Sequence, residues 1–157
     1  MLQFAFDGHF DNPYLPHNFI PNTVAYTGTH DNAPTRQWYE ELPDYQRQNF
    51  WSYANRAPGG EADAAPSLMQ FAWSSSAALA IAPLQDLLSL GAESRMNVPG
   101  RASGNWGWRC TDEKLSLAAF QWLRELTENS KRTSPGISSQ TIDLESVNAA
   151  RVVPLQV

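Results

Sequence analysis

Residues 23–32, TVAYTGTHDN, decide the fold. The β-branched and aromatic residues of the first half predict a buried strand over residues 23–27, which Gly28 ends. A polar cluster follows at once, and Pro34 then lies in the first turn of a predicted helix, a position that proline favours. The stretch is therefore a strand, a polar loop and the start of a helix, in that order.

The same order occurs twice more in the chain. Residues 2–6 form a short apolar run ended by Asp7 and Gly8, which predicts a strand buried on both faces. Residues 77–82 form another apolar run, ended by Pro83, and we interpret it as a third buried strand. Strands that alternate with helices form parallel sheets, so the sequence predicts an α/β fold.

The helices have recognisable ends. Asn32 is a candidate N-cap for a helix that Pro43 ends, and Pro66 is expected to open a later helix. Thr111 is the expected cap of the clearest helix, whose apolar residues recur at spacings of three and four. Those apolar residues are Leu115, Ala118, Ala119, Trp122, Leu123 and Leu126.

Acidic residues and a histidine follow the predicted strands. In parallel α/β folds the carboxyl ends of the strands face the functional site, so we expect these side chains to share one rim. The residues concerned are Asp7, Asp11, His30, Asp31 and Asp86.

Length, charge and cysteine content exclude several classes. The 157 residues suit one domain, and a net charge of −5 without a basic stripe argues against a nucleic-acid partner. A single cysteine, Cys110, closes no intrachain disulfide, and no apolar run is long enough for a membrane span, so we expect a cytoplasmic protein without a membrane partner. The Ser- and Thr-rich residues 133–157 lack periodicity and are expected to form a flexible tail.

Carboxylates beside tryptophans suit carbohydrate chemistry, because sugar hydroxyls bond to carboxylates and the apolar sugar face stacks on aromatic rings. The alternative to sugar stacking for the tryptophans is packing in the hydrophobic core. We expect it for Trp122 from its helical phase, and favour it for Trp38, Trp51 and Trp73. Trp106 and Trp108 lie in a predicted loop.

Other readings of the polar residues are weaker. The cluster at residues 29–32 can be explained by helix capping alone. A metal site built from His9, Asp11, His17 and His30 is conceivable, but the spacing matches no tight zinc pattern, so no metal is expected. Neither residues 74–76 (SSS) nor Cys110 has the surroundings of a catalytic nucleophile.

Several motifs taken together go beyond composition. Over residues 1–130 the chain resembles the C-terminal part of the 4-alpha-glucanotransferases, also called amylomaltases or disproportionating enzymes. The motifs keep that family's order and approximate spacing. They are residues 2–7 (LQFAFD), 11–18 (DNPYLPHN), 26–32 (YTGTHDN), 96–100 (MNVPG) and 104–109 (GNWGWR).

This resemblance implies a catalytic (β/α)₈ TIM barrel that transfers α-1,4-glucan segments to the 4-hydroxyl of an acceptor sugar by a retaining mechanism, without a cofactor. Its expected ligands are maltooligosaccharides. The resemblance makes Asp31 the transition-state stabiliser and His30 its substrate-binding neighbour, and it places Asp7 and Asn97 in the substrate site as weaker assignments. The nucleophile and the acid/base of the family lie on earlier strands, outside this chain.

A closed barrel has eight strands and about 250 residues, whereas this sequence predicts three strands. We therefore expect residues 1–132 to be the last three βα units of a barrel, incomplete alone. Unpaired edges and an unfilled interior predict association with the remainder of the barrel or with a second copy. A non-catalytic glucan-binding module and a purely structural fragment are the alternatives.

Overall fold

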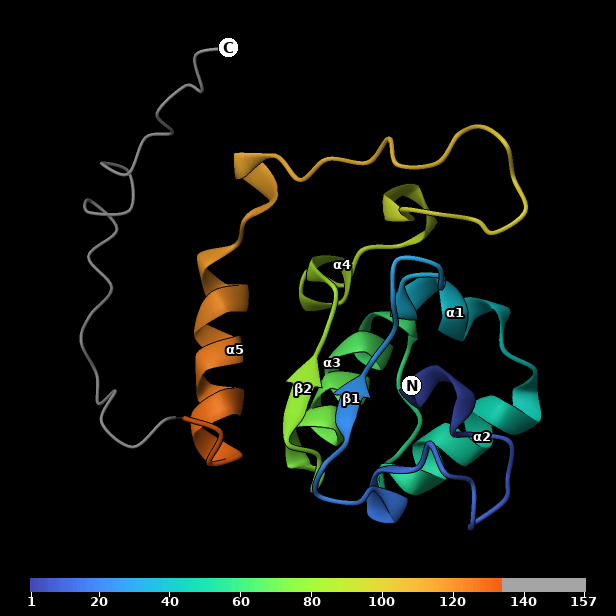
Figure 1. The fold of residues 1–157 in the computed structure, drawn as a ribbon, viewed down its shortest axis with the longest axis vertical. Helices are drawn as coiled ribbons and strands as arrows, with labels where there is room; N and C mark the ends of the chain where they lie inside the picture. The colour runs from blue at the N-terminus through green and yellow to red at the C-terminus, as the bar shows by residue number, and fades with distance from the viewer. Residues whose placement is uncertain (134–157) are drawn as a thin grey trace.

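A computed structural model describes residues 1–133 of the chain (Figure 1). The tail predicted for residues 133–157 thus lies, from residue 134 on, outside the described residues.

Two of the three predicted strands are confirmed. β1 (Val24–Tyr26) and β2 (Leu79–Ile81) pair in parallel, with Ala25 opposite Ala80. The ladder continues past both ends of β1, where the Ala78 amide donates to Thr23 O at 2.9 Å and the Thr27 amide donates to Ile81 O at 3.1 Å. The two strands lie side by side in front of α3 (Figure 1), as a strand–helix–strand connection requires.

Besides this pair, residues 1–133 form five α-helices and four short 3₁₀ segments. The α-helices are α1 (Thr35–Glu41), α2 (Asp44–Tyr53), α3 (Glu61–Ser74), α4 (Leu84–Leu87) and α5 (Leu117–Asn129). The 3₁₀ segments are η1 (Leu2–Phe4), η2 (Pro16–Asn18), η3 (Ala92–Ser94) and η4 (Asp112–Lys114).

The strand predicted for residues 2–6 is wrong, because this segment forms η1. The amides of Phe4 and Ala5 bond back to Met1 O and Leu2 O, which closes a local turn in place of a ladder. The segment contains no β-branched residue to favour an extended backbone. Its burial is predicted in part: Leu2 and Ala5 are core residues, whereas Phe4 is 53% exposed.

The core is an aromatic cluster between η1, α2 and α3. Phe50 is fully buried and its ring meets that of Phe6 edge-on, with centroids 4.9 Å apart. Trp51 is 2% exposed and its indole N–H donates to the hydroxyl of Tyr39 at 2.7 Å, so its polar atom is satisfied. The core role favoured for Trp51 is confirmed, while Trp38 packs against the edge of this core and stays half-buried.

Two predicted helix starts differ from the structure. α3 begins at Glu61, and Pro66 lies inside it, because acidic Glu61 and Asp63 suit the positive first turn and the Gly60 amide donates to Asp63 Oδ2 at 2.9 Å. Thr111 precedes η4, and α5 is capped instead by Ser116, whose hydroxyl accepts the Ala119 amide at 3.4 Å.

The apolar stripe of α5 is not a core face. No residue of α5 is fully buried, and Trp122 is only half-buried, so the core placement predicted for Trp122 is wrong. α5 contacts α3 and α4 at its side, where the indole N–H of Trp73 donates to Thr127 Oγ1 at 3.0 Å. Figure 1 shows α5 standing beside β2, linked to the rest by the long segment that follows η3.

One face of the strand pair is only partly covered by residues 1–133. Ala25 and Ala80 point toward α3, whereas the alternate residues Val24, Leu79 and Ile81 are 37%, 58% and 41% exposed. Aliphatic side chains on both strands thus form a continuous apolar surface, here called the open sheet face. Such a surface is normally buried against another layer.

Within the described residues, no helix combines the length and apolar character needed to cross a lipid bilayer.

Candidate functional site

The loop between β1 and α1 (residues 28–34) carries the two predicted catalytic-site residues, His30 and Asp31. Two hydrogen bonds within the loop stabilise its conformation, because Asn32 Oδ1 accepts both the Thr29 amide at 3.1 Å and the Thr29 hydroxyl at 2.8 Å. Asn32 is therefore a loop residue and not the helix cap that we predicted, and Pro34 occupies the N-cap position of α1. The capping explanation of this cluster fails for Asn32.

His30 and Asp31 lie at the surface beside each other. The side chains are 57% and 49% exposed, and His30 Nε2 lies 3.3 Å from Asp31 Oδ1. Both groups can therefore reach a ligand from solvent. A carboxylate accepts hydrogen bonds from sugar hydroxyls, and an imidazole can donate to them or accept from them.

The segment of residues 95–109 folds over this pair from a distant part of the sequence. Asn97 Nδ2 donates to Asp31 Oδ1 at 2.7 Å, and Arg95 Nη2 donates to the Asp31 carbonyl oxygen at 3.2 Å. Arg95 also donates through Nε to Asn97 O at 3.0 Å, which fixes both residues to each other. The structure thus brings predicted residues 31 and 97 into direct contact.

Trp106 adds an aromatic surface to the pair. Its ring centroid lies 5.2 Å from that of His30 at an interplanar angle of 40°, and the residue is 51% exposed. Trp106 has a positive φ of 62°, and the hydrogen bond that its backbone amide donates to Met96 O at 2.7 Å supports that unusual backbone conformation. An exposed indole beside a carboxylate and an imidazole can stack on the apolar face of a sugar ring.

Asp7 lies in a different loop from His30 and Asp31. It is exposed, its Oδ1 accepts the His9 amide at 3.0 Å, and that bond, with the Asn12 side chain, lowers the pKa of Asp7. Among residues 1–133, no hydrogen bond or ion pair joins Asp7 to His30, Asp31 or Asn97.

Asp86 departs from the single acidic rim that we predicted. It is 2% exposed and accepts hydrogen bonds from Thr27 and Thr35 beneath the loop. Burial raises the pKa of Asp86, and these hydrogen bonds oppose that effect. We predicted Asp86 at the rim because this residue follows a strand. The apolar character of the surrounding segment was the signal that its carboxyl group is buried.

Gln3 is a second residue whose role the sequence did not reveal. Its side chain is buried, and Nε2 donates to Ala33 O at 2.9 Å and to Thr35 Oγ1 at 3.4 Å. The signal was present, since Gln3 is the only polar residue in the apolar run of residues 2–6.

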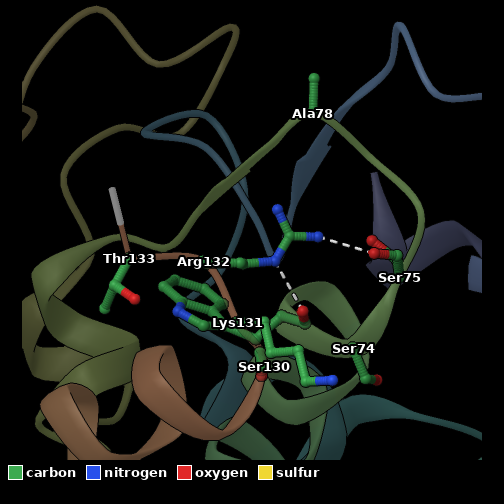
Figure 2. Close-up of a pocket in the computed structure, with 8 residues that line it drawn as sticks. Ser74, Ser75, Ala78, Ser130, Lys131, Arg132 and Thr133 are labelled. Atoms are coloured by element: carbon green, nitrogen blue, oxygen red, sulfur yellow. Dashed lines mark hydrogen bonds between the residues drawn. The ribbon is translucent and has the colours of Figure 1, made fainter. Parts of the chain in front are cut away.

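Among residues 1–133, two surface hollows are lined by residues other than His30 and Asp31. One, of about 410 Å³, lies at the end of α3. There the guanidinium of Arg132 donates to the carbonyl oxygens of Trp73, Ser75 and Ala77. Figure 2 shows the bond from Arg132 to Ser75 beside this hollow. The other, of about 280 Å³, lies between α2 and the loop that carries His9.

Arg132 is fully engaged with backbone carbonyls. It therefore acts as a clip that holds α5 to the C-terminal end of α3, where carbonyls otherwise lack partners.

No cluster of three or more candidate metal ligands occurs among residues 1–133. His17, one of the four residues considered for such a site, instead stacks between Phe10 and Tyr53.

Comparison with known proteins identifies relatives of one kind. Residues 1–116 match the family model described as 4-alpha-glucanotransferase. The chain is 49% identical over 109 residues to the chloroplastic/amyloplastic 4-alpha-glucanotransferase of Arabidopsis thaliana, which covers 69% of this chain and 19% of the relative. It is 42% identical over 139 residues to the 4-alpha-glucanotransferase of Thermus thermophilus, covering 84% and 27% of the two chains.

A solved structure agrees. The amylomaltase from Streptococcus agalactiae in complex with acarbose superposes with a TM-score of 0.76 at 32% identity, over 85% of this chain and 27% of that one. The chain therefore spans about a fifth to a quarter of the length of the relatives it matches.

Proposed function

The chain belongs to the 4-alpha-glucanotransferase family, and we propose that it supplies the C-terminal part of an enzyme that transfers α-1,4-glucan segments to the 4-hydroxyl of an acceptor sugar. The observation that carries the proposal is the meeting of Asp31 and Asn97 at 2.7 Å, with the Trp106 ring on His30 beside them. Two segments far apart in the sequence together present a carboxylate, an amide, an imidazole and an exposed indole, which are the groups that read sugar hydroxyls and sugar faces.

In this proposal Asp31 stabilises the transition state. Its carboxylate accepts hydrogen bonds from the hydroxyls of the sugar at the cleavage point, and these bonds strengthen as the ring acquires oxocarbenium character. Bonds that are stronger in the transition state than in the bound substrate raise the rate. His30 binds the same sugar, and Asn97 both orients Asp31 and donates to the glucan.

Asp7 is the weakest of the proposed substrate contacts. Its low pKa keeps it ionised and able to accept hydrogen bonds, but it lies in a different loop from His30. We propose that Asp7 contacts the substrate only when the chain is assembled with the rest of the enzyme.

A retaining reaction needs a nucleophile and an acid/base about 5–5.5 Å apart. We propose that both lie in the part of the protein that corresponds to the remaining three quarters of the relatives. The isolated chain then has no turnover of its own.

The same remainder is proposed to complete a (β/α)₈ barrel around the open sheet face. Val24, Leu79 and Ile81 would point into the barrel interior, where such positions are filled by branched aliphatic side chains. The parallel pairing of β1 and β2 and the position of α3 behind them are consistent with consecutive units of such a barrel.

Reconstitution tests this proposal. The chain is mixed with the part of the Thermus thermophilus relative that precedes its match, and glucose release from maltotriose is measured for the mixture and for each part alone. We expect glucose from the mixture only. Full turnover by the chain alone would refute the proposal.

Two further results would favour the alternatives. Acarbose binding by the isolated chain, with no turnover in the mixture, would favour a glucan-binding module. Absence of both acarbose binding and turnover would favour a purely structural fragment.

A further inference from the structure

The loop of residues 28–34 begins and ends on the same buried carboxyl group. Thr27 is the first residue after β1 and Thr35 is the first residue of α1, so the loop that carries His30 and Asp31 runs between them. Asp86 Oδ2 accepts the Thr27 hydroxyl at 2.6 Å and the Thr35 hydroxyl at 2.8 Å. Both ends of the loop are thereby held at one oxygen atom.

The second oxygen of Asp86 fixes the start of α1. Oδ1 accepts the Thr35 backbone amide at 2.8 Å, and this amide is one of the first in α1, where no intrahelical acceptor exists. The carboxylate also lies at the positive end of that helix. Position and direction of the chain are therefore both set as it leaves the loop.

These contacts are shielded from water. Thr27 and Thr35 are 0% exposed and Asp86 is 2% exposed, so the hydrogen bonds do not compete with solvent. Within residues 1–133, no Lys, Arg or His forms an ion pair with Asp86, and the three donors from Thr27 and Thr35 are its partners. Burying a carboxyl group without a cation is costly, which argues for a specific role.

We propose that Asp86 is a positioning residue that ties both ends of the loop 28–34 and so sets where the imidazole of His30 and the carboxylate of Asp31 stand. It does this from α4, the element that follows β2, and so makes the geometry of one βα loop depend on the next unit of the fold. The link to catalysis rests on the proposed function, whereas the link to the loop rests on the structure of residues 1–133.

Gln3 supports the arrangement from a third segment. Its Nε2 bonds to Ala33 O and Thr35 Oγ1, and a Cβ atom built on Gly28 would lie 3.0 Å from that nitrogen. The first residue of the loop therefore passes close to a side chain that also holds its last part. The loop is fastened at both ends and leaves its middle, His30 and Asp31, exposed.

Hydrogen exchange of the full chain tests the positioning role. Asp86→Ala should accelerate exchange of the loop amides at residues 28–33 by about tenfold or more, while amides in the buried middle of α3 keep wild-type rates. Asp86→Asn should stay within about threefold of wild type. The side-chain carbonyl of the new asparagine still accepts the Thr35 amide, and its NH₂ can donate to the rotatable hydroxyls of Thr27 and Thr35.

Two further variants keep the test decisive. Thr27→Val removes only the bond at the β1 end, so it should loosen residues 28–30 even if Asp86→Ala fails to fold. Ser67→Ala removes a buried hydroxyl of α3 that lies outside this network, and it should leave loop exchange unchanged. The proposal would be overturned if loop exchange were unchanged in Asp86→Ala and Thr27→Val. It would also be overturned if Asp86→Ala accelerated exchange equally throughout α3, or if Asp86→Asn exchanged as fast in the loop as Asp86→Ala.

The reconstituted enzyme supplies the functional readout. Because a misplaced transition-state stabiliser lowers kcat more than it weakens ground-state binding, Asp86→Ala should reduce kcat for maltotriose by about 100-fold with a much smaller change in KM. Equal loss in Ser67→Ala would overturn the catalytic link. If the wild-type mixture gives no glucose, the proposed function fails, and the exchange experiment still decides whether Asp86 holds the loop.

Discussion

The open sheet face makes a quantitative prediction that two leucines can test. Leu68 in α3 is 0% exposed, whereas Leu79 in β2 is 58% exposed. Leu68→Ala should therefore lower the free energy of unfolding of the chain by about 2–5 kcal/mol, the usual cost for a buried leucine. Leu79→Ala should cost less than about 1 kcal/mol, because full burial of a leucine contributes only about 1.5–3 kcal/mol and less than half of this one is covered.

If the chain associates with the remainder of a barrel as proposed, Leu79 should contribute more to binding than it contributes to the stability of the isolated chain. Once the open sheet face is covered, Leu79→Ala should weaken association by about 2 kcal/mol, or roughly 30-fold in the dissociation constant. Urea denaturation of the isolated chain gives the first quantity, and titration against the remainder of the Thermus thermophilus relative gives the second.

The result that would refute this reasoning is an equal cost of the two substitutions in the isolated chain, independent of protein concentration. Leu79 would then be buried already within one molecule. A cost for Leu79→Ala that rises with concentration would instead show that a second copy covers the open sheet face.

Three further predictions concern the interior and the packing of α5. Tyr39→Phe should lower the free energy of unfolding by about 1–3 kcal/mol in urea denaturation, because it leaves the buried Trp51 indole N–H without its acceptor; a similar cost for exposed Tyr45→Phe would contradict this. Since burial raises the folded-state pKa of Asp86, its contribution to stability is fully present below the unfolded value near 3.8 and is lost as pH rises through the folded value. Chemical denaturation from pH 3 to 8 should therefore show wild type losing stability relative to Asp86→Asn as pH rises, and a constant difference would contradict the burial argument. Arg132→Met should loosen α5 from α3 and speed proteolysis near residues 117–129, and an unchanged digestion rate would contradict its role as a clip.

The sequence predicted the two paired strands well, because β-branched and aliphatic residues between glycine, proline and polar clusters leave few other choices. It failed for residues 2–6, where a run of apolar residues was taken for a strand. Burial was the correct part of that prediction, but apolar character alone does not distinguish an extended segment from a 3₁₀ turn.

The helical periodicity that predicted α5 was correct about the helix and wrong about its burial. Apolar residues at spacings of three and four show that a face needs cover, but not whether the cover comes from the same chain. Trp122 is only half-buried among the described residues, and the periodicity alone did not reveal this.

At the site, the sequence correctly placed His30 and Asp31 in the loop after a strand. It did not separate the carboxyl groups that reach solvent from the one that does not, because Asp31 and Asp86 both follow strands. The distinction depends on Thr27 and Thr35, whose hydroxyls turn toward Asp86 in three dimensions only.

The most direct test of the account is the effect of Asp31→Asn on glucose release from maltotriose by the reconstituted enzyme. Asparagine keeps the size of the side chain but removes the charge that we propose faces the sugar. We predict a loss of about 100-fold or more in kcat, as expected when one stabilising group of a transition state is removed. The control Asp44→Asn, at an exposed aspartate in the first turn of α2, should change kcat little. Wild-type turnover by Asp31→Asn would contradict the account.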